Sequence, residues 1–271
     1  MRKIGMDELR QKQMEILDYV TAFCDENDIC YVLVGGTLLG SVRHKGYIPW
    51  DDDIDIGMLR EDYERFSELF PKKCDKPGYV FQSPELDKRW HLPFGKVMDM
   101  NTLFLQDGHN LGINIDIFPF DDTPNDPKAT ARMYKIRNCL KYISAAQMRK
   151  QRPSGNILRR LVACCVRLVL HCFPDYYFMQ RIAIRARKYA GKGYVHFGNF
   201  TGENEAEPCE KSIMRDRITA AFEDREYKIP RDYDTWLRAY YGDYMTLPPE
   251  SERKRHTYEA FVAEEGEVIR R

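Results

Sequence analysis

Four aspartates fall within five consecutive positions of this 271-residue chain. They are Asp51, Asp52, Asp53 and Asp55. Carboxylates this close repel one another and resist ionisation unless a cation lies between them. Mg²⁺ and Mn²⁺ prefer oxygen ligands such as carboxylates, phosphate oxygens and water. The spacing therefore suggests a divalent-cation site, of the kind that phosphoryl-transferring enzymes use to hold a polyphosphate and offset developing charge.

The residues around these aspartates predict how they are held. Polar and apolar residues alternate over 53–56, which favours a half-buried strand with Asp53 and Asp55 on one face. Residues 113–118 alternate in the same way, so that Asp116 lies on one face of a second strand. Asp116 can therefore complete an oxygen-rich site with the first two aspartates.

Two other interpretations of the acidic stretch are open. One is a solvated acidic loop, but the alternating isoleucines argue against it, because uncompensated carboxylates on a half-buried strand are costly. The other is a calcium loop, since Asp51, Asp53, Asp55 and Asp62 follow the EF-hand spacing. That loop needs a glycine at its sixth position, where this chain has Ile56, and it normally ends in Glu.

A glycine pair lies upstream of the aspartates. Residues 29–34 form an apolar run that predicts a buried strand, which Gly35–Gly36 ends. Thr37 can then cap a short helix over 37–44. Backbone N–H groups at a helix N-terminus, together with the positive end of the helix dipole, form an anion site, and the basic residues 43–45 add charge.

The remaining pattern predicts an α+β protein. Further helices are expected over 7–26, 60–70 and 233–241, strands over 79–82, 91–99 and 102–106, and a hairpin near 218–229. We divide the chain into a core of residues 1–127 with the acidic strands, a basic helical region over 128–192, and a portion over 193–271 that packs back on the core and completes the site.

The net charge of zero hides a strong asymmetry along the chain. Residues 128–192 contain 16 Lys or Arg and one acidic residue, whereas the rest of the chain contains 26 basic and 41 acidic residues. Such a block predicts an anionic partner. Within it, 157–173 is either a core helix with one basic stripe or an interfacial helix on anionic lipid headgroups. No nucleic-acid-binding motif accompanies the charge, so we expect no nucleic acid partner.

Composition predicts an ordinary globular protein. No stretch reaches the roughly 20 apolar residues that a membrane-spanning helix needs, and the first residues contain no apolar signal-peptide core. The eight cysteines form no CxxC pair, which favours reduced thiols. We therefore expect a cytoplasmic protein, located at the inner face of the membrane if its basic region binds lipid.

Taken together, the motifs resemble a known family. The string GGTLLGSVRHKGYIPWDDDIDIG at 35–57, with KVMD at 96–99, NIDIFPFD at 114–121 and YGDYMTLPPE at 241–250, is similar to the LicD family, which includes the fukutin-related proteins. The resemblance runs from about residue 10 to 256 and is weakest across 128–210. It implies a nucleotidyltransferase-like mixed sheet with flanking helices, followed by a helical basic portion.

The resemblance also implies an activity. Members of this family transfer a phospho-alcohol, typically phosphocholine from CDP-choline, to a hydroxyl of a surface-glycan precursor and release CMP. The implied partners are a CDP-alcohol donor, a glycan acceptor that can be lipid-linked, and Mg²⁺ or Mn²⁺ as cofactor. Two alternatives are a true nucleotidyltransferase, which attaches the nucleotide itself, and a non-catalytic nucleotide- or membrane-binding module.

The family pattern assigns roles to individual residues. Asp53 and Asp55 are the implied metal ligands, and Asp116 is the third carboxylate, either a ligand or a general base. Asp51 and Asp52 are expected to shape the loop. The implied substrate-binding residues are Gly35, Gly36, Thr37, Arg43, Lys96, Arg253 and His256.

Overall fold

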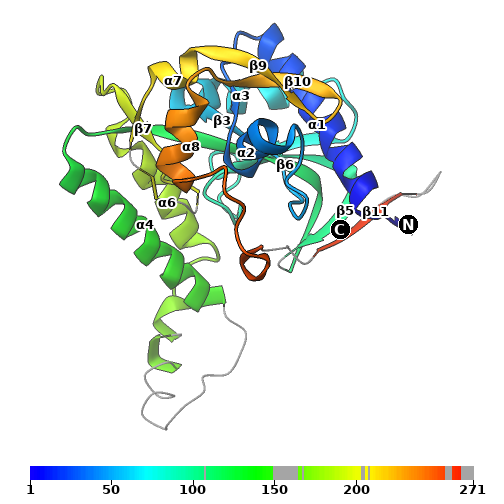
Figure 1. Ribbon diagram of the computed structural model, residues 1–271. Helices are drawn as coiled ribbons and strands as arrows, with labels where there is room; N and C mark the ends of the chain where they lie inside the picture. The colour runs from blue at the N-terminus through cyan, green and yellow to red at the C-terminus, as the bar shows by residue number, and fades with distance from the viewer. Residues whose placement is uncertain are drawn as a thin grey trace.

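The computed structural model shows a curved β-sheet with helices packed around it and a helical projection at one edge (Figure 1). It describes residues 1–106, 108–148, 164–166, 168–202, 205–206, 208–253 and 258–263. Residues 157–163 and 167 of the helix predicted over 157–173 lie outside these residues, as does His256.

The sheet combines antiparallel pairs with one parallel pair. Its path runs through β1 (Arg2–Lys3), β11 (Tyr258–Val262), β5 (Gly95–Gln106), β6 (His109–Thr123), β3 (Asp55–Leu59) and β2 (Val32–Leu33). Strand β4 (Tyr79–Gln82) pairs with β5, and β7 (His196–Gly198) joins β6 to β8 (Cys209–Glu210). Strands β3 and β6 run parallel, and the other pairs within the described residues are antiparallel. The predicted α+β class with a mixed sheet is confirmed.

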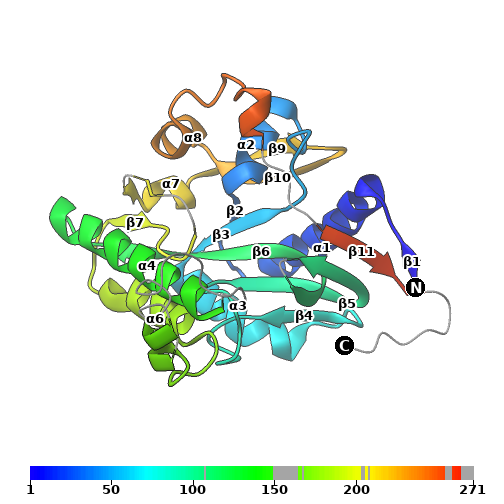
Figure 2. The same cartoon turned by 90° about the horizontal axis from the view of Figure 1, so that it is seen from below.

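The two faces of the sheet are covered by different helices (Figure 2). On one face, the fully buried Ile113, Ile115 and Ile117 of β6 meet α1 (Met6–Glu26) and α3 (Arg60–Lys73). The opposite face carries α2 (Gly35–His44) and α8 (Tyr233–Tyr241), whose Trp236 packs 5.2 Å from the Phe120 ring. The alternation of β6 thus places an isoleucine row on one side and Asp116 on the other.

A β-hairpin links the helices of the two layers. It consists of β9 (Arg217–Phe222) and β10 (Arg225–Pro230), as predicted. Ser41 of α2 donates to the carbonyl of Ala221 at 2.8 Å, and the Tyr227 hydroxyl donates to Asp18 of α1 at 2.6 Å. The hairpin therefore fixes α2, which precedes the loop that contains Asp51, Asp52 and Asp53, relative to α1.

Several predicted boundaries were wrong although the element types were right. The strand expected over 29–34 is reduced to Val32–Leu33, and the helix after it begins at Gly35 rather than Thr37, with no side-chain cap. The strands expected over 91–99 and 102–106 are one strand, β5, which begins only at Gly95 and whose pairing with β6 shifts between Asp99 and Phe104. A bulge of this kind interrupts the alternation without ending the strand.

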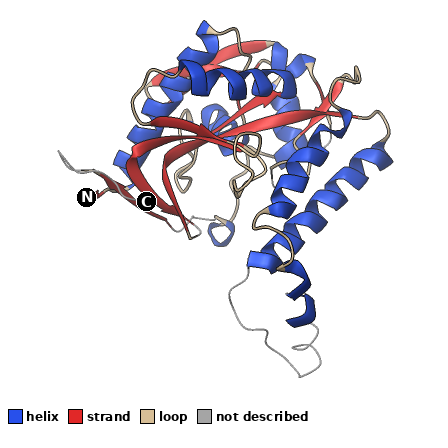
Figure 3. Cartoon of the chain, turned by 180° about the vertical axis from the view of Figure 1, so that it is seen from behind, coloured by secondary structure: helices blue, strands red, loops and turns tan. Residues whose placement is uncertain are grey.

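Helices α4 (Pro127–Met148) and α6 (Tyr177–Ala186), followed by the 3-10 helix η1 (Arg187–Tyr189), project side by side from one edge of the sheet (Figure 3). We call these three elements the helical arm. Short helical stretches also occur at 164–166 and 168–170. The arm begins directly where β6 ends, so its position depends on how that junction is held.

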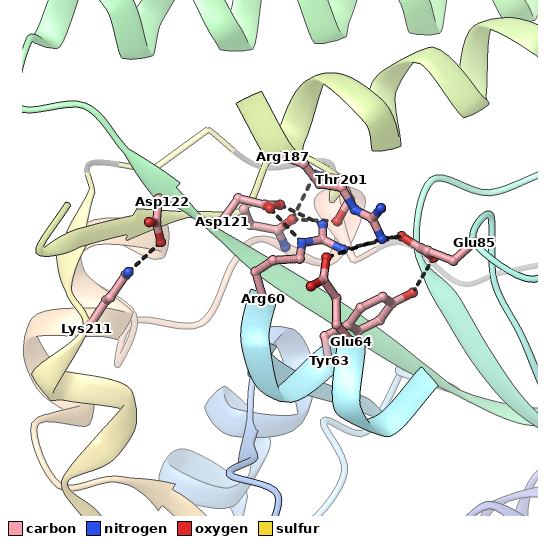
Figure 4. Close-up of polar contacts among 10 residues, drawn as sticks. Arg60, Tyr63, Glu64, Glu85, Asp121, Asp122, Arg187, Thr201 and Lys211 are labelled. Atoms are coloured by element: carbon pink, nitrogen blue, oxygen red, sulfur yellow. Dashed lines mark hydrogen bonds and ion pairs between the residues drawn. The ribbon is translucent and has the colours of Figure 1, made fainter. Parts of the chain in front are cut away.

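A buried network of ion pairs holds the junction (Figure 4). The guanidinium of Arg60 on α3 donates two hydrogen bonds to Asp121 of β6, at 2.7 and 2.9 Å. Glu85 accepts a hydrogen bond at 2.8 Å from Arg187 of the arm and contacts Arg60 at 3.3 Å. Because Asp121 is fully buried, its charge depends on this pairing.

Two further expectations concern cysteines and membrane spans. All eight cysteines are free thiols, as predicted. Among the described residues, no helix is both long enough and apolar enough to cross a bilayer.

Candidate active site

Three neighbouring strands bring charged side chains together on the α2 face of the sheet. Asp55 at the start of β3 pairs in register with Asp116 of β6, and Asp116 pairs with Lys96 of β5. Adjacent strands are about 4.8 Å apart, so these three side chains lie in one row. The Lys96 ammonium donates to a carboxylate oxygen of Asp116 and, at 2.9 Å, to the side-chain oxygen of Asn114.

The surroundings of Asp55 disfavour the ionised form of its carboxyl group. Burial raises its pKa well above the usual range, and the nearby carboxylates of Asp53, Asp116 and Asp51 raise it further. Lys96 acts in the opposite direction. The site therefore favours the arrival of additional positive charge, because a cation between these carboxylates removes the repulsion.

The N-terminus of α2 faces the same carboxylates. Gly35 has a positive φ of +57°, and a Cβ there would overlap the carboxylate of Asp55. A Cβ at Gly36 would overlap the carboxylate of Asp51. The glycine pair thus permits a close approach, and the positive end of the helix dipole lies beside the acidic cluster.

Thr37 links α2 to the start of β3. Its side chain is buried, and its hydroxyl accepts a hydrogen bond from the backbone N–H of Asp55 at 2.8 Å. Thr37 therefore fixes the start of β3 against α2 instead of capping the helix. The predicted contact of Gly35, Gly36 and Thr37 with a donor phosphate stays a prediction.

Asp53 lies in the loop before β3, not within the strand as predicted. The physical reason is that the loop backbone is held by side chains of α1. Arg10 donates to the carbonyl of Asp51 at 2.6 Å, and Gln13 donates to the carbonyl of Asp52 at 2.8 Å. The loop is thus fixed without strand pairing, and Asp53 still lies close enough to raise the pKa of Asp55.

Tyr241 was absent from the predicted site. Burial raises its pKa, and the charges of Asp55, Asp51 and Asp53 raise it further, so these carboxylates lie within electrostatic range of its hydroxyl. The charge of Arg43 partly offsets this rise in the pKa of Tyr241, so Arg43 also lies within electrostatic range of the Tyr241 hydroxyl. The one sequence signal for Tyr241 was its place at the start of the string over 241–250, which carries no chemical pattern of its own.

Arg43 and Arg253 hold the C-terminal segment over the site. The guanidinium of Arg43 donates to the carbonyl of Tyr244 at 2.6 Å, and burial lowers its pKa. Arg253 lies 4.6 Å from the centre of the Trp50 ring and donates to the carbonyl of Pro248 at 3.1 Å. Each arginine therefore has a structural contact within the protein, and the predicted role of both in binding substrate stays a prediction.

A metal ion at this site would have to share the row with Lys96. Within the described part of the chain, no three His, Cys, Asp or Glu side chains are already grouped in a geometry that could hold one. Asp116 is directed at Lys96 instead. The donor chemistry nevertheless fits Mg²⁺ or Mn²⁺, because the carboxylates of Asp53, Asp55 and Asp116 lie close enough to raise the pKa of Asp55, and oxygen ligands are those that these ions prefer.

Comparison with known proteins identifies the family. The model of the LicD/FKTN/FKRP nucleotidyltransferase domain matches residues 28–142, which include β2, α2, β3, β5 and β6. Lipopolysaccharide cholinephosphotransferase LicD of Haemophilus influenzae is 30% identical over 268 residues, which cover 97% of this chain and all of the relative.

Two mouse proteins match over a shorter range. Ribitol 5-phosphate transferase FKRP is 28% identical over 39% of this chain and 20% of its own length. Ribitol-5-phosphate transferase FKTN is 30% identical over 41% of this chain and 21% of its own length. Since the bacterial relative matches across nearly the whole chain and the shared domain contains the acidic strands, this protein is a member of the LicD family.

Proposed function

We propose that this protein is a metal-dependent phosphotransferase that moves a phospho-alcohol, in the first instance phosphocholine, from a CDP-alcohol to a hydroxyl of a glycan precursor. The observation that carries the proposal is the row of Asp55, Asp116 and Lys96 beside the glycine-lined N-terminus of α2. This row combines carboxylates for a cation, an ammonium for phosphate and backbone donors for a second anionic group. Phosphoryl transfer requires positioning and charge stabilisation of this kind.

The names of the relatives favour this activity over nucleotide transfer. The bacterial relative is a cholinephosphotransferase, and the two mouse relatives are ribitol phosphate transferases. Each name describes transfer of an alcohol together with its phosphate. A CDP-alcohol is the donor that delivers such a group with CMP as the leaving group.

In the reaction, the acceptor hydroxyl attacks the phosphorus that carries the alcohol. A new bond forms between this oxygen and phosphorus, and the bond from phosphorus to the bridging oxygen breaks, so that CMP leaves with that oxygen. Asp116 accepts the proton of the hydroxyl. Lys96, which holds Asp116 in the row, also provides positive charge for the transferred phosphate.

A bound Mg²⁺ or Mn²⁺ would be held by Asp53 and Asp55 and would stabilise negative charge on the two phosphates. Thr37 and Gly35 keep Asp55 in place for this role. Arg43, whose guanidinium donates to the carbonyl of Tyr244, would keep the segment after α8 near the cluster.

The remaining partners follow from the same proposal. The acceptor is a glycan hydroxyl, and a lipid-linked acceptor would bring the enzyme to the cytoplasmic face of a membrane. The basic region over 128–192 would then contact anionic lipid through its excess of Lys and Arg.

The test is a screen of CDP-alcohols for CMP release in the presence of an oligosaccharide acceptor and Mg²⁺. We expect release with one CDP-alcohol and a mass increase of the acceptor by that phospho-alcohol. Asp55→Asn and Asp116→Asn should each reduce the rate at least about 100-fold, as expected for groups that act on the reacting phosphate. Chelation of divalent cations should reduce it equally.

The matched control is Asp224→Asn, which makes the same chemical change at a side chain that is 82% exposed. It should retain full activity. Full turnover by Asp55→Asn would overturn the proposal. An acceptor mass increase equal to a nucleotide would instead identify a nucleotidyltransferase.

A further inference from the structure

A separate cavity of about 310 Å³ lies within the helical arm, between α4 and the segment formed by α6 and η1. These elements run side by side in Figures 1 and 3. From Asp116 to Thr123, the end of β6, seven residues of strand span about 23 Å. The cavity begins beyond that end, so it is distinct from the acidic site.

The inner wall of the cavity is mostly apolar, and the one buried cation in it, Arg137, is paired with Glu205. Met133, Ile136 and Leu140 of α4 form one side of this wall. Ile182 of α6 and Phe200 form the other, and both side chains are 2% exposed. Such a surface favours contact with hydrocarbon over water.

The rim of the cavity is cationic. Lys128 and Arg132 extend from α4, and Arg185 and Lys188 from α6 and η1. All four residues are exposed, and across the described ranges no carboxylate lies within ion-pair distance of any of them. Asp126 is the one acidic residue in the cavity lining.

The four rim cations differ from the neighbouring Arg187 in their pairing with carboxylates. Arg187, next to Lys188, pairs with both Glu85 and Glu64 at the junction with the sheet. The fold thus neutralises a cation where the cation has a structural role. Four like charges around one opening repel one another, and an anion at the centre removes that cost.

We propose that this cavity binds an amphiphile that carries a phosphate or diphosphate group. The anionic group lies between Arg132 and Arg185 at the rim, and the apolar part lies on the inner wall beside Ile136 and Phe200. The inference does not rest on the proposed transferase activity, since it concerns a cavity separate from Asp55 and Asp116.

The test is calorimetric titration of the full chain with octyl phosphate below its micelle concentration, without donor or divalent metal. Inorganic phosphate and octyltrimethylammonium serve as comparison ligands, because each lacks one of the two features. We expect octyl phosphate to bind at least tenfold more tightly than either.

Two kinds of variant locate the binding. The double variant Arg132→Glu with Arg185→Glu should weaken octyl phosphate at least tenfold, and Ala129→Trp should do so by filling the cavity with no change in charge. The matched control is Lys135→Glu, the same charge change at an exposed position on α4 outside this cavity. It should bind as the parent does. Circular dichroism checks that each variant is folded.

Four outcomes would overturn the inference. They are equal binding of inorganic phosphate, equal binding of octyltrimethylammonium, full binding by the double variant, and a loss with Lys135→Glu as large as with the double variant. Asp55→Asn should bind octyl phosphate normally. If octyl phosphate did not bind, the transferase proposal would therefore be unaffected. If CMP were not released, the proposal for this cavity would be unaffected.

Discussion

Charged side chains of the sheet region and of the cavity rim in the helical arm differ in whether they form ion pairs. In the sheet, the buried Arg60 pairs with Asp121, and Lys96 pairs with Asp116. At the rim of the cavity in the arm, Arg132 and Lys188 are exposed, and among the described residues no carboxylate lies within ion-pair distance of either. Buried charges are costly unless they are paired, whereas exposed charges cost little and remain available to a ligand. The difference separates charges that hold the fold from charges that can bind.

The largest effect on stability is expected at the junction of the two regions. Arg60→Met leaves Asp121 buried without its partner, so the free energy of unfolding should fall by about 3–5 kcal/mol. Urea denaturation measures this change. As a control, Arg231→Met removes an exposed pair with Asp216 and should cost no more than about 1 kcal/mol. Similar losses for the two variants would contradict the distinction.

The second-largest effect on stability is expected at the start of α2. Gly35→Ala should lower the free energy of unfolding by about 1–3 kcal/mol, because φ is positive there and the new Cβ would displace the Asp55 carboxylate. CMP release should fall with it. Gly5→Ala is the control, since nothing lies within 4 Å of a Cβ at that position. Thermal unfolding of both variants decides whether the glycine is required by the site.

A pH effect is expected where the sheet and the arm meet. The His91 ring stacks 3.8 Å from His109 of β6 and lies 6.0 Å from Tyr176, just before α6. Burial, together with the charges of His109 and Lys96, lowers the pKa of His91 to about 3. Between this value and the ordinary 6.5 the unfolded chain binds the extra proton, so stability is complete above pH 6.5 and is lost as pH falls.

His91→Gln should remove that part of the pH dependence. From pH 6.5 to 5 the parent should lose about 1–2 kcal/mol more than the variant. Urea denaturation at each pH measures the difference, and His171→Gln, at an exposed position, is the control. Parallel curves for the parent and His91→Gln would contradict the interpretation.

The smallest effect is expected in the arm itself. Arg132→Glu and Lys188→Glu should each change the free energy of unfolding by no more than about 0.5 kcal/mol, because both side chains are exposed and neither pairs with a carboxylate among the described residues. Urea denaturation at low and high salt measures this. A loss comparable to that of Arg60→Met would show that the rim is structural.

Local patterns predicted much of the fold. The apolar spacing of 7–26 gave α1 within one residue at its start, and α8 was predicted with its observed bounds over 233–241. Boundaries failed where tertiary contacts replace local ones. Asp53 lies outside β3 because Arg10 and Gln13, some forty residues upstream, hold the loop backbone. No local signal contains that information.

The family could be recognised from the sequence alone, which also predicts a chemistry for the acidic site. Closely spaced aspartates, a second alternating strand and a glycine pair are local features, and they are sufficient to suggest a cation and a phosphate. The pairing of Lys96 with Asp116, the electrostatic coupling of Tyr241 to Asp55 and the cavity of the helical arm are visible in the folded chain and have no local signal in the sequence. Each of these depends on strand register or helix packing between distant segments, which side-chain burial across the whole chain fixes.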